Sequence, residues 1–166
     1  MRELIIHPHD PVYDENSKVL ILGTMPSPGS RKAGFYYGHP QNMFWRVMAA
    51  VFDEEIPRDI PEKTRFLLRN RLALWDVLRS CEIDGASDSS IKNPVPNDLS
   101  VIFANADIKA VFTTGTVATK LYKKYCEEEF MPSVYLPSTS PANRGRFDFE
   151  GLVGAYRAVR EALSAF

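Results

Sequence analysis

The sequence predicts an α/β fold in which helices wind around a parallel sheet, and three observations support this prediction. Four short segments are apolar without alternation, which is typical of parallel strands covered on both faces. Helical patterns fill the intervals between them, and strands that alternate with helices form a layered sandwich with right-handed crossovers. The 166 residues suffice for a sizeable core, so we expect a single domain over residues 1–166. The expected strands are KVLILGTM (18–25), LALWDV (72–77), KAVFTTG (109–115) and SVYLPST (133–139).

Apolar residues at helical spacing indicate where the helices lie. Pro61 suits the first turn of one helix, and Thr116 is placed to cap another that carries Val117, Leu121 and Tyr125. Between the first two strands, a stripe at i, i+3, i+4, i+7 and i+8 predicts a helix with an apolar face made of Phe44, Val47, Met48, Val51 and Phe52. The last helix presents one face made of Leu152, Tyr156, Val159, Leu163 and Phe166.

The composition excludes several classes of protein. A formal net charge of -1 argues against a protein coated with positive potential, although a local basic patch is compatible with it. The longest apolar runs are far shorter than a membrane span, and the N-terminus MRELIIHPHD lacks the features of a signal peptide. We therefore expect a cytoplasmic protein.

Cysteine and histidine do not indicate a metal or redox centre. Cys81 and Cys126 lie far apart, and we expect both to be small buried hydrophobic residues. His7, His9 and Asp10 have the donor atoms to chelate a metal, but the prolines beside them favour a surface turn. The chain has no GxGxxG, Walker lysine loop, HExxH or GxSxG motif, which removes those enzyme classes.

Long segments rich in Gly, Pro and Ser follow three of the expected strands. Open α/β sheets bind ligands outside the carboxyl ends of their strands, and loops of this length usually serve a function. These segments are therefore expected to meet at a ligand site. They read GTMPSPGSRKAGFYYGHP, RSCEIDGASDSSIKNPVPN and STSPANRGRFD.

The first and last of these segments combine hydroxyl groups with cations. The hydroxyls of Ser27 and Ser30, with backbone N–H groups, could hold a phosphate, although a turn without a ligand explains GTMPSPGS equally well. Cations and hydroxyls that converge beside aromatic rings suit a nucleic-acid backbone and an unstacked base. For any one cation taken alone, a solvent-exposed position at the rim of the protein, without a ligand, is the simpler explanation. The cations are Arg31, Lys32, Arg144 and Arg146.

The stretch GFYYGHPQNMFW (34–45) crowds aromatic residues around one uncharged amide. Tyr36 and Tyr37 are bulky rings in a loop and could sandwich a planar base, whereas Phe44 belongs to the core stripe. The pattern leaves the role of Trp45 open. Asn42 lies at the start of the predicted helix, where periodicity alone favours an N-cap.

The motifs LILGTMPSPGS, FYYGHPQNMFW, ALWDV followed by DGASDSSI, and LPSTSPANRG together resemble the uracil-DNA glycosylase superfamily, most closely its hypoxanthine-DNA (deoxyinosine) glycosylase branch. The resemblance spans residues 18–145 and includes the order of the motifs. It implies a three-layer α/β/α sandwich with a central four-stranded parallel sheet, without metal or cofactor. It also implies a monomer that acts at the nucleoid on DNA containing a damaged or deaminated base.

The resemblance implies a catalytic role for Asn42. Many relatives carry an Asp or Asn in the first-strand loop, where this chain has Thr24 and Met25, so that loop is expected only to hold the substrate. Uracil-specific relatives begin the last motif with a histidine, where this chain has Leu136, so strong assistance of the uracil type is not expected. Asp76 lies on the strand that ends with a base-reading asparagine in uracil enzymes; it either contacts the flipped base or caps the following segment.

The expected contacts fall into two further groups. The base is expected to contact Gly23, Thr24, Met25, Tyr36, Tyr37, Trp45, Asp76 and Ser138. The DNA is expected to contact Ser27, Ser30, Arg31, Lys32, Thr139, Ser140, Pro141, Asn143 and Arg144. Either Pro141 or Arg144 is expected to fill the space that the flipped base leaves in the stack.

We therefore expect a monofunctional DNA glycosylase that flips out a deaminated base, with hypoxanthine favoured, and leaves an abasic site in base excision repair. An amide does not titrate near neutral pH, so the oxygen of Asn42 is expected to orient a water rather than act as a strong base. A competing hypothesis keeps the fold but places the activity on uracil or thymine in mismatches. A non-catalytic module that binds a nucleotide or phosphate, and a degenerate glycosylase fold kept for protein interactions, are also compatible with the sequence.

Overall fold

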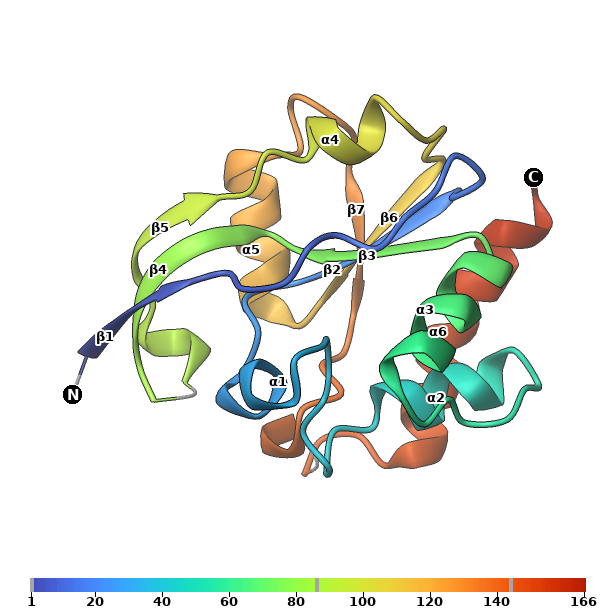
Figure 1. The fold of residues 1–166 in the computed structure, drawn as a ribbon, viewed down its shortest axis with the longest axis horizontal. Helices are drawn as coiled ribbons and strands as arrows, with labels where there is room; N and C mark the ends of the chain where they lie inside the picture. Colours follow the sequence, from blue (N-terminus) through green and yellow to red (C-terminus); the bar gives the residue numbers. More distant parts are fainter. Residues whose placement is uncertain (1, 86, 144) are drawn as a thin grey trace.

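The computed structural model describes residues 2–85, 87–143 and 145–166. Its centre is a four-stranded sheet with the order β3-β2-β6-β7, in which all neighbouring strands are parallel (Figure 1). The predicted parallel sheet is thereby confirmed, with somewhat shorter strands than expected. They are β2 (Val19–Gly23), β3 (Leu72–Asp76), β6 (Ala110–Thr114) and β7 (Ser133–Leu136).

The strands differ in how far they are covered. Every residue of β2 and β3 is buried, as their unbroken apolar sequences predict. The expectation of full cover is wrong for β7, where Val134 is 52% exposed and Tyr135 is 44% exposed. The reason is topological, because β7 forms the edge of the sheet.

Helices cover both faces of the sheet and complete the three-layer α/β/α sandwich. On one face, α3 (Ile60–Arg69) packs on β3, while α6 (Phe149–Ser164) packs on β2 and on α2 (Phe44–Val51). On the other face, α5 (Thr116–Tyr125) packs on β6 and β7. Figure 1 shows α2, α3 and α6 together on one side of the strands and α5 on the other. The short helices are α1 (Pro28–Ala33) and α4 (Ser100–Phe103).

The helix boundaries confirm some sequence expectations and correct others. The apolar face predicted for α2 is buried at Phe44, Val47, Met48 and Val51. Pro61 lies in the first turn of α3, as predicted. Thr116 is the first residue of α5 rather than its cap, because Gly115 takes the cap position with a φ of 90° and no side-chain cap bond is made. Phe166 lies beyond the end of α6 and is 52% exposed, so it does not extend the apolar face.

A second sheet occupies a segment that was expected to be irregular. It is antiparallel, with the order β1-β4-β5, and consists of β1 (Arg2–Ile6), β4 (Leu78–Asp84) and β5 (Lys92–Pro96). Only Val77 separates β3 from β4, so the chain passes almost directly from one sheet into the other. The expectation of a loop was wrong because the burial of Leu78, Cys81 and Ile83 alternates too irregularly for a strand signal.

The core contains both cysteines and the buried side chain of Tyr156. Cys81 and Cys126 are buried free thiols, as expected. The hydroxyl of the fully buried Tyr156 on α6 donates to the carbonyl oxygen of Pro137 at 2.6 Å, which ties α6 to the end of β7. Within the described part of the chain, none of the helices combines the length and the apolar character that a membrane span requires.

Candidate active site

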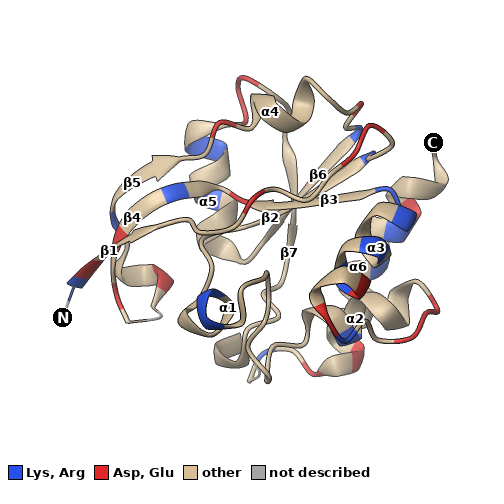
Figure 2. Ribbon diagram, in the orientation of Figure 1, with Lys and Arg blue, Asp and Glu red and all other residues tan. Residues whose placement is uncertain are grey.

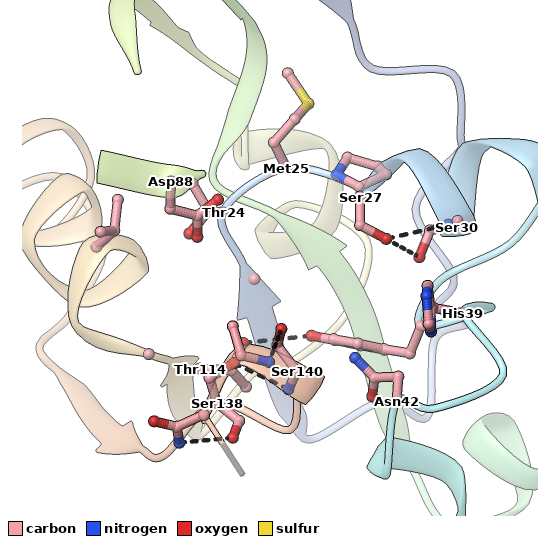
Figure 3. A pocket seen from close by; sticks show the side chains of 18 of the residues that line it. Thr24, Met25, Ser27, Ser30, His39, Asn42, Asp88, Thr114, Ser138 and Ser140 are labelled. Carbon is pink, nitrogen blue, oxygen red and sulfur yellow. Dashed lines mark hydrogen bonds between the residues drawn. The ribbon is translucent and has the colours of Figure 1, made fainter. Parts of the chain in front are cut away.

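A cavity of about 690 Å³ opens at the carboxyl ends of the parallel strands. Its wall is formed by the ends of β2, β3 and β6, the segment around α1, residues 36–42, and the loop after β7. Ligands of open α/β sheets bind in this position, and the volume lies in the range of small-molecule sites. Figure 3 shows Asn42 and His39 on one side of the cavity, with Thr24 and Asp88 across from them.

Most residues expected at the site lie in this wall, although they come from distant parts of the chain. From the group expected to contact the base, the lining includes Gly23, Thr24, Met25, Tyr36, Tyr37, Asp76 and Ser138. From the group expected to contact DNA, it includes Ser27, Ser30, Arg31, Ser140, Pro141 and Asn143. The predicted convergence of the first and last loops is therefore present in the structure.

Three expected residues are placed differently from the prediction. Trp45 is 5% exposed, and its ring stacks on Phe35 in the core rather than lining the cavity. Lys32 is exposed on α1 outside the lining. Thr139 is 2% exposed and stands behind the wall. Arg144, one of the two expected wedges, lies outside the described residues.

Asn42 is half-buried in the wall, and its amide is held from two sides. Its Oδ1 accepts the backbone N–H of Phe44 at 2.9 Å and the hydroxyl of Thr139 at 2.8 Å. The N–H of Met43 also donates to the carbonyl oxygen of Thr139, at 3.1 Å. The start of α2 is thus fastened to the loop after β7, and this fastening sets the position of the amide.

These bonds determine which end of the Asn42 amide faces the cavity. A backbone N–H can only donate, so the atom opposite the Phe44 amide must be the oxygen. Figure 3 shows the nitrogen of Asn42 directed toward the cavity. The N-cap position of α2 belongs to Met43, so the predicted cap at Asn42 is wrong by one residue, although the Asn42 oxygen still accepts the first N–H of the helix. The free end of the Asn42 side chain is a donor rather than the expected oxygen.

The two tyrosines of the aromatic stretch have different surroundings. Tyr37 is half-buried in the wall, and its ring stacks on Phe44 with centroids 4.0 Å apart and an angle of 13° between the planes. Its φ of 53° is unusual for a bulky residue and indicates a position imposed by the surroundings. Burial, reinforced by the charge of Asp76, raises the pKa of Tyr37. Tyr36 is only 2% exposed and donates to the carbonyl oxygen of Asp10 at 2.7 Å, so it offers no open ring face.

The segment after β1 does not form the expected surface turn. The side chain of His7 is only 3% exposed, and its Nε2 lies 2.7 Å from Oδ2 of Asp76 at the end of β3. The sequence carried no signal for this contact because 69 residues separate the partners and β1 was not anticipated. Within the described ranges, no group of three or more His, Cys, Asp or Glu side chains is arranged to hold a metal ion.

Several further residues of the wall were not predicted, and three of those with polar or ionisable side chains lie beside the predicted ones. Thr114 ends β6, and its position at a strand end was a usable signal. His39 lies beside Gly29, where an added β-carbon would come within 2.8 Å of its ring. Asp88 belongs to η1 (Asp88–Ser90), and its carboxyl is turned toward Thr24 (Figure 3). Desolvation raises the pKa of Asp88, while the hydrogen bond with Thr24 opposes this shift.

Positive charge at the cavity is local. Arg31 and Arg146 line the cavity, and Lys32 is exposed on the same short helix as Arg31. Figure 2 shows other Lys and Arg residues on α3, α5 and α6, with acidic residues also present on α3 and α6. The guanidinium of Arg31 donates to the carbonyl oxygen of Pro26 at 3.3 Å, which holds it at the rim.

Comparison with known proteins identifies the family. The family model of the uracil DNA glycosylase superfamily matches residues 11–164. The chain belongs to the uracil DNA glycosylase superfamily. Two relatives of this superfamily member, from Methanosarcina barkeri and Methanosarcina acetivorans, are named hypoxanthine DNA glycosylase. They are 33% and 34% identical over 81% and 80% of this chain, and the matched regions cover 85% of each relative.

A solved structure agrees with this assignment. It is a solution NMR structure from Methanosarcina acetivorans, of a protein proposed to be a uracil DNA glycosylase, and it superposes with a TM-score of 0.79 at 28% identity. The match covers 95% of this glycosylase-family chain and 99% of the other. The family, the fold and the names of the relatives support a DNA glycosylase with a DNA substrate.

Proposed function

We propose that this protein is a monofunctional DNA glycosylase that removes hypoxanthine from DNA and leaves an abasic site. The observation that carries the proposal is the Asn42 amide, held by Phe44 and Thr139 in the wall of the cavity at the strand ends. The relatives named hypoxanthine DNA glycosylase favour this base over others.

The substrate base enters the cavity only after it leaves the duplex. Extrusion costs a few kcal/mol and is easiest for mispaired or damaged bases, so selection begins at this step. The exposed side of Tyr37, whose ring is braced by Phe44, is the aromatic surface against which the flipped base packs. Arg31 and the hydroxyls of Ser27 and Ser140 at the rim are suited to the flanking phosphates.

Cleavage of the N-glycosidic bond produces a cationic sugar and an anionic base. Because both lone pairs of Asn42 Oδ1 are occupied, the Nδ2 group donates to the attacking water and leaves a lone pair of that water free for C1′. The departing anionic base takes up the proton that the water loses. Such positioning accelerates the reaction without a titrating base. A base that leaves readily as an anion, such as hypoxanthine, suits this chemistry better than adenine does.

The monofunctional assignment rests on the side chains in the wall. A glycosylase that also nicks the strand needs an amine to form a Schiff base with the sugar. No lysine is found among the described residues that line the cavity, and Lys32 projects outside it. Borohydride treatment during turnover is therefore expected to trap no covalent protein–DNA adduct.

The deciding experiment uses labelled duplexes that differ in one base. Purified protein is incubated with duplexes carrying inosine, uracil or a G·T pair, and abasic sites are then cleaved with alkali. A shortened strand mainly from the inosine duplex is the expected result. Faster excision of uracil or thymine would replace the proposed substrate, and the absence of any excision would contradict a glycosylase function.

A further inference from the structure

A buried carboxylate and a buried imidazole form a pair at the floor of the cavity. The side chains of Asp76 and His7 are 6% and 3% exposed, and the contact from Oδ2 to Nε2 measures 2.7 Å. Such pairs often contribute no more stability than apolar residues of similar size would. A buried pair in a cleft is therefore a candidate for a functional role.

The hydrogen bond at the second nitrogen of His7 shows which ring nitrogen carries the proton. Its Nδ1 accepts the backbone N–H of His9 at 3.2 Å, and a backbone amide can only donate. The Nδ1 atom therefore carries no proton, and Nε2–H is the donor to Asp76. A tilted contact with Tyr36 and an edge contact with Trp75 hold the ring in this orientation.

The other oxygen of Asp76 faces the cavity beside Gly23. A β-carbon built on Gly23 would lie 2.5 Å from Asp76 Oδ1 and 3.1 Å from the hydroxyl of Tyr37, so only glycine leaves this oxygen accessible. In residues 2–85, 87–143 and 145–166, no donor is hydrogen-bonded to Oδ1. Asp76 belongs to the cavity lining, so one acceptor is available to a molecule that enters the cavity.

We propose that His7 is a positioning residue that fixes Asp76 as an acceptor, so that the cavity selects flipped bases carrying a ring N–H over bases with a ring-nitrogen lone pair. The inference rests on the proposed glycosylase function and specifies how its substrate is chosen. Hypoxanthine and uracil present a ring N–H on the edge used for base pairing, whereas adenine and cytosine present a lone pair there.

The chemistry of a carboxylate explains the direction of this selection. An ionised carboxylate is an acceptor only, so it bonds the N–H of hypoxanthine but faces the ring nitrogen of adenine with lone pair against lone pair. A site with a buried polar group rejects strongly any ligand that leaves this group unpaired. A negative group does not stabilise a leaving anion, so Asp76 acts on selection rather than on the rate of bond cleavage.

Asp76→Asn tests the inference because His7 also orients the replacement. The Nε2–H of His7 would bond the amide oxygen, and the amide nitrogen would then face the cavity as a donor. Binding is measured with duplexes carrying 2′-fluoro-deoxyinosine or 2′-fluoro-deoxyadenosine opposite cytosine, because the fluorine destabilises the cationic sugar and prevents cleavage. The preference of the wild-type protein for the inosine duplex is expected to fall at least about tenfold in Asp76→Asn.

Variants of His7 and Asp88 complete the experiment. His7→Phe should reduce the same affinity ratio, and His7→Gln, which keeps a donor, should restore part of it. Asp88→Asn is the matched control, because it removes another carboxylate of the wall without changing the acceptor beside Gly23, and its ratio should equal that of the wild-type protein.

The outcomes separate this inference from the proposed function. An unchanged ratio in Asp76→Asn, with inosine excision by the wild-type protein intact, overturns the inference alone. A fall of equal size in Asp88→Asn would also overturn it, because the effect would then reflect cavity charge. A wild-type protein that excises no base refutes the proposed function instead.

Discussion

At the scale of single residues, the site depends on an uncharged amide whose orientation is set by its neighbours. Asn42 shares its oxygen between the first turn of α2 and Thr139, which lies 97 positions further along the chain. Because the oxygen is occupied on both sides, the amide is preorganised before any substrate arrives. Preorganisation of this kind lowers the cost of reaching the transition state.

Asn42→Ala removes the amide, while the backbone bond from Met43 to Thr139 still joins the start of α2 to the loop after β7 and keeps the fold in place. Excision is expected to fall by about two orders of magnitude or more, while binding to DNA stays close to that of the wild-type protein. Single-turnover excision and fluorescence anisotropy measure the two quantities. Asn105→Ala, which changes an exposed asparagine just after α4, should behave as the wild-type protein. Normal turnover in Asn42→Ala would remove the amide from the mechanism.

Thr139→Val deletes the hydroxyl that donates to Asn42 and keeps the shape of the side chain. The freed lone pair lets the amide turn, so we expect excision to fall by about tenfold and Thr139→Ser to recover most of it. Thr64→Val, which removes a hydroxyl bonded within α3, is the matched control. Equal rates in Thr139→Val and the wild-type protein would show that the hydroxyl does not position the amide.

At the scale of elements, the antiparallel sheet brings side chains to the cavity region that the parallel sheet does not provide. β1 carries the chain to His7, and the β4–β5 connection carries Asp88 to the side of Thr24. The carboxyl ends of the parallel strands therefore form only part of the wall. The helices contribute mainly by fixing the strands, as α6 does through Tyr156 and Pro137.

Asp148→Ala tests the anchoring of α6. The carboxylate of Asp148 caps this helix by accepting the N–H of Gly151 at 2.8 Å, and loss of such a cap costs about 1 kcal/mol. We expect the free energy of unfolding in urea to fall by about that amount with excision retained. Lys109→Ala, which breaks an exposed ion pair with Asp107, should cost less than about 0.5 kcal/mol. Equal costs would show that the cap contributes no more than a surface charge.

At the scale of the whole molecule, a nearly neutral protein must engage a highly charged polymer. The formal net charge is -1, so attraction to DNA depends on where the cations lie. Arg31, Lys32 and Arg146 gather where the first and last loops meet, while charges elsewhere are mixed (Figure 2). We therefore expect DNA to bind at the mouth of the cavity.

Arg31→Ala tests this distribution through the dependence of DNA affinity on salt. Each phosphate contact releases counterions, so the slope of log affinity against log salt should decrease in magnitude by about one. Anisotropy titrations at several salt concentrations give the slope. Arg58→Ala removes an exposed arginine near the start of α3 and should leave the slope unchanged. Equal slopes for Arg31→Ala and the wild-type protein would exclude a phosphate contact by Arg31.

Much of this protein was determined by sequence alone. Unbroken apolar segments specify strands buried on both faces, and the periodicity of Phe44, Val47 and Met48 specifies a helix packed on a sheet. The motifs around Asn42 and after the last strand were sufficient to indicate the family. These are local signals, because each depends on residues close together in the chain.

Tertiary structure decided which groups face the cavity. The pairing of His7 with Asp76, the burial of Tyr36 and Trp45, and the turning of the Asn42 nitrogen toward the cavity all depend on contacts between distant segments. Residue types record that a side chain can donate or accept, but not which partner occupies it. That choice is made when the sheets and loops pack, because a buried polar atom must find its partner within the fold.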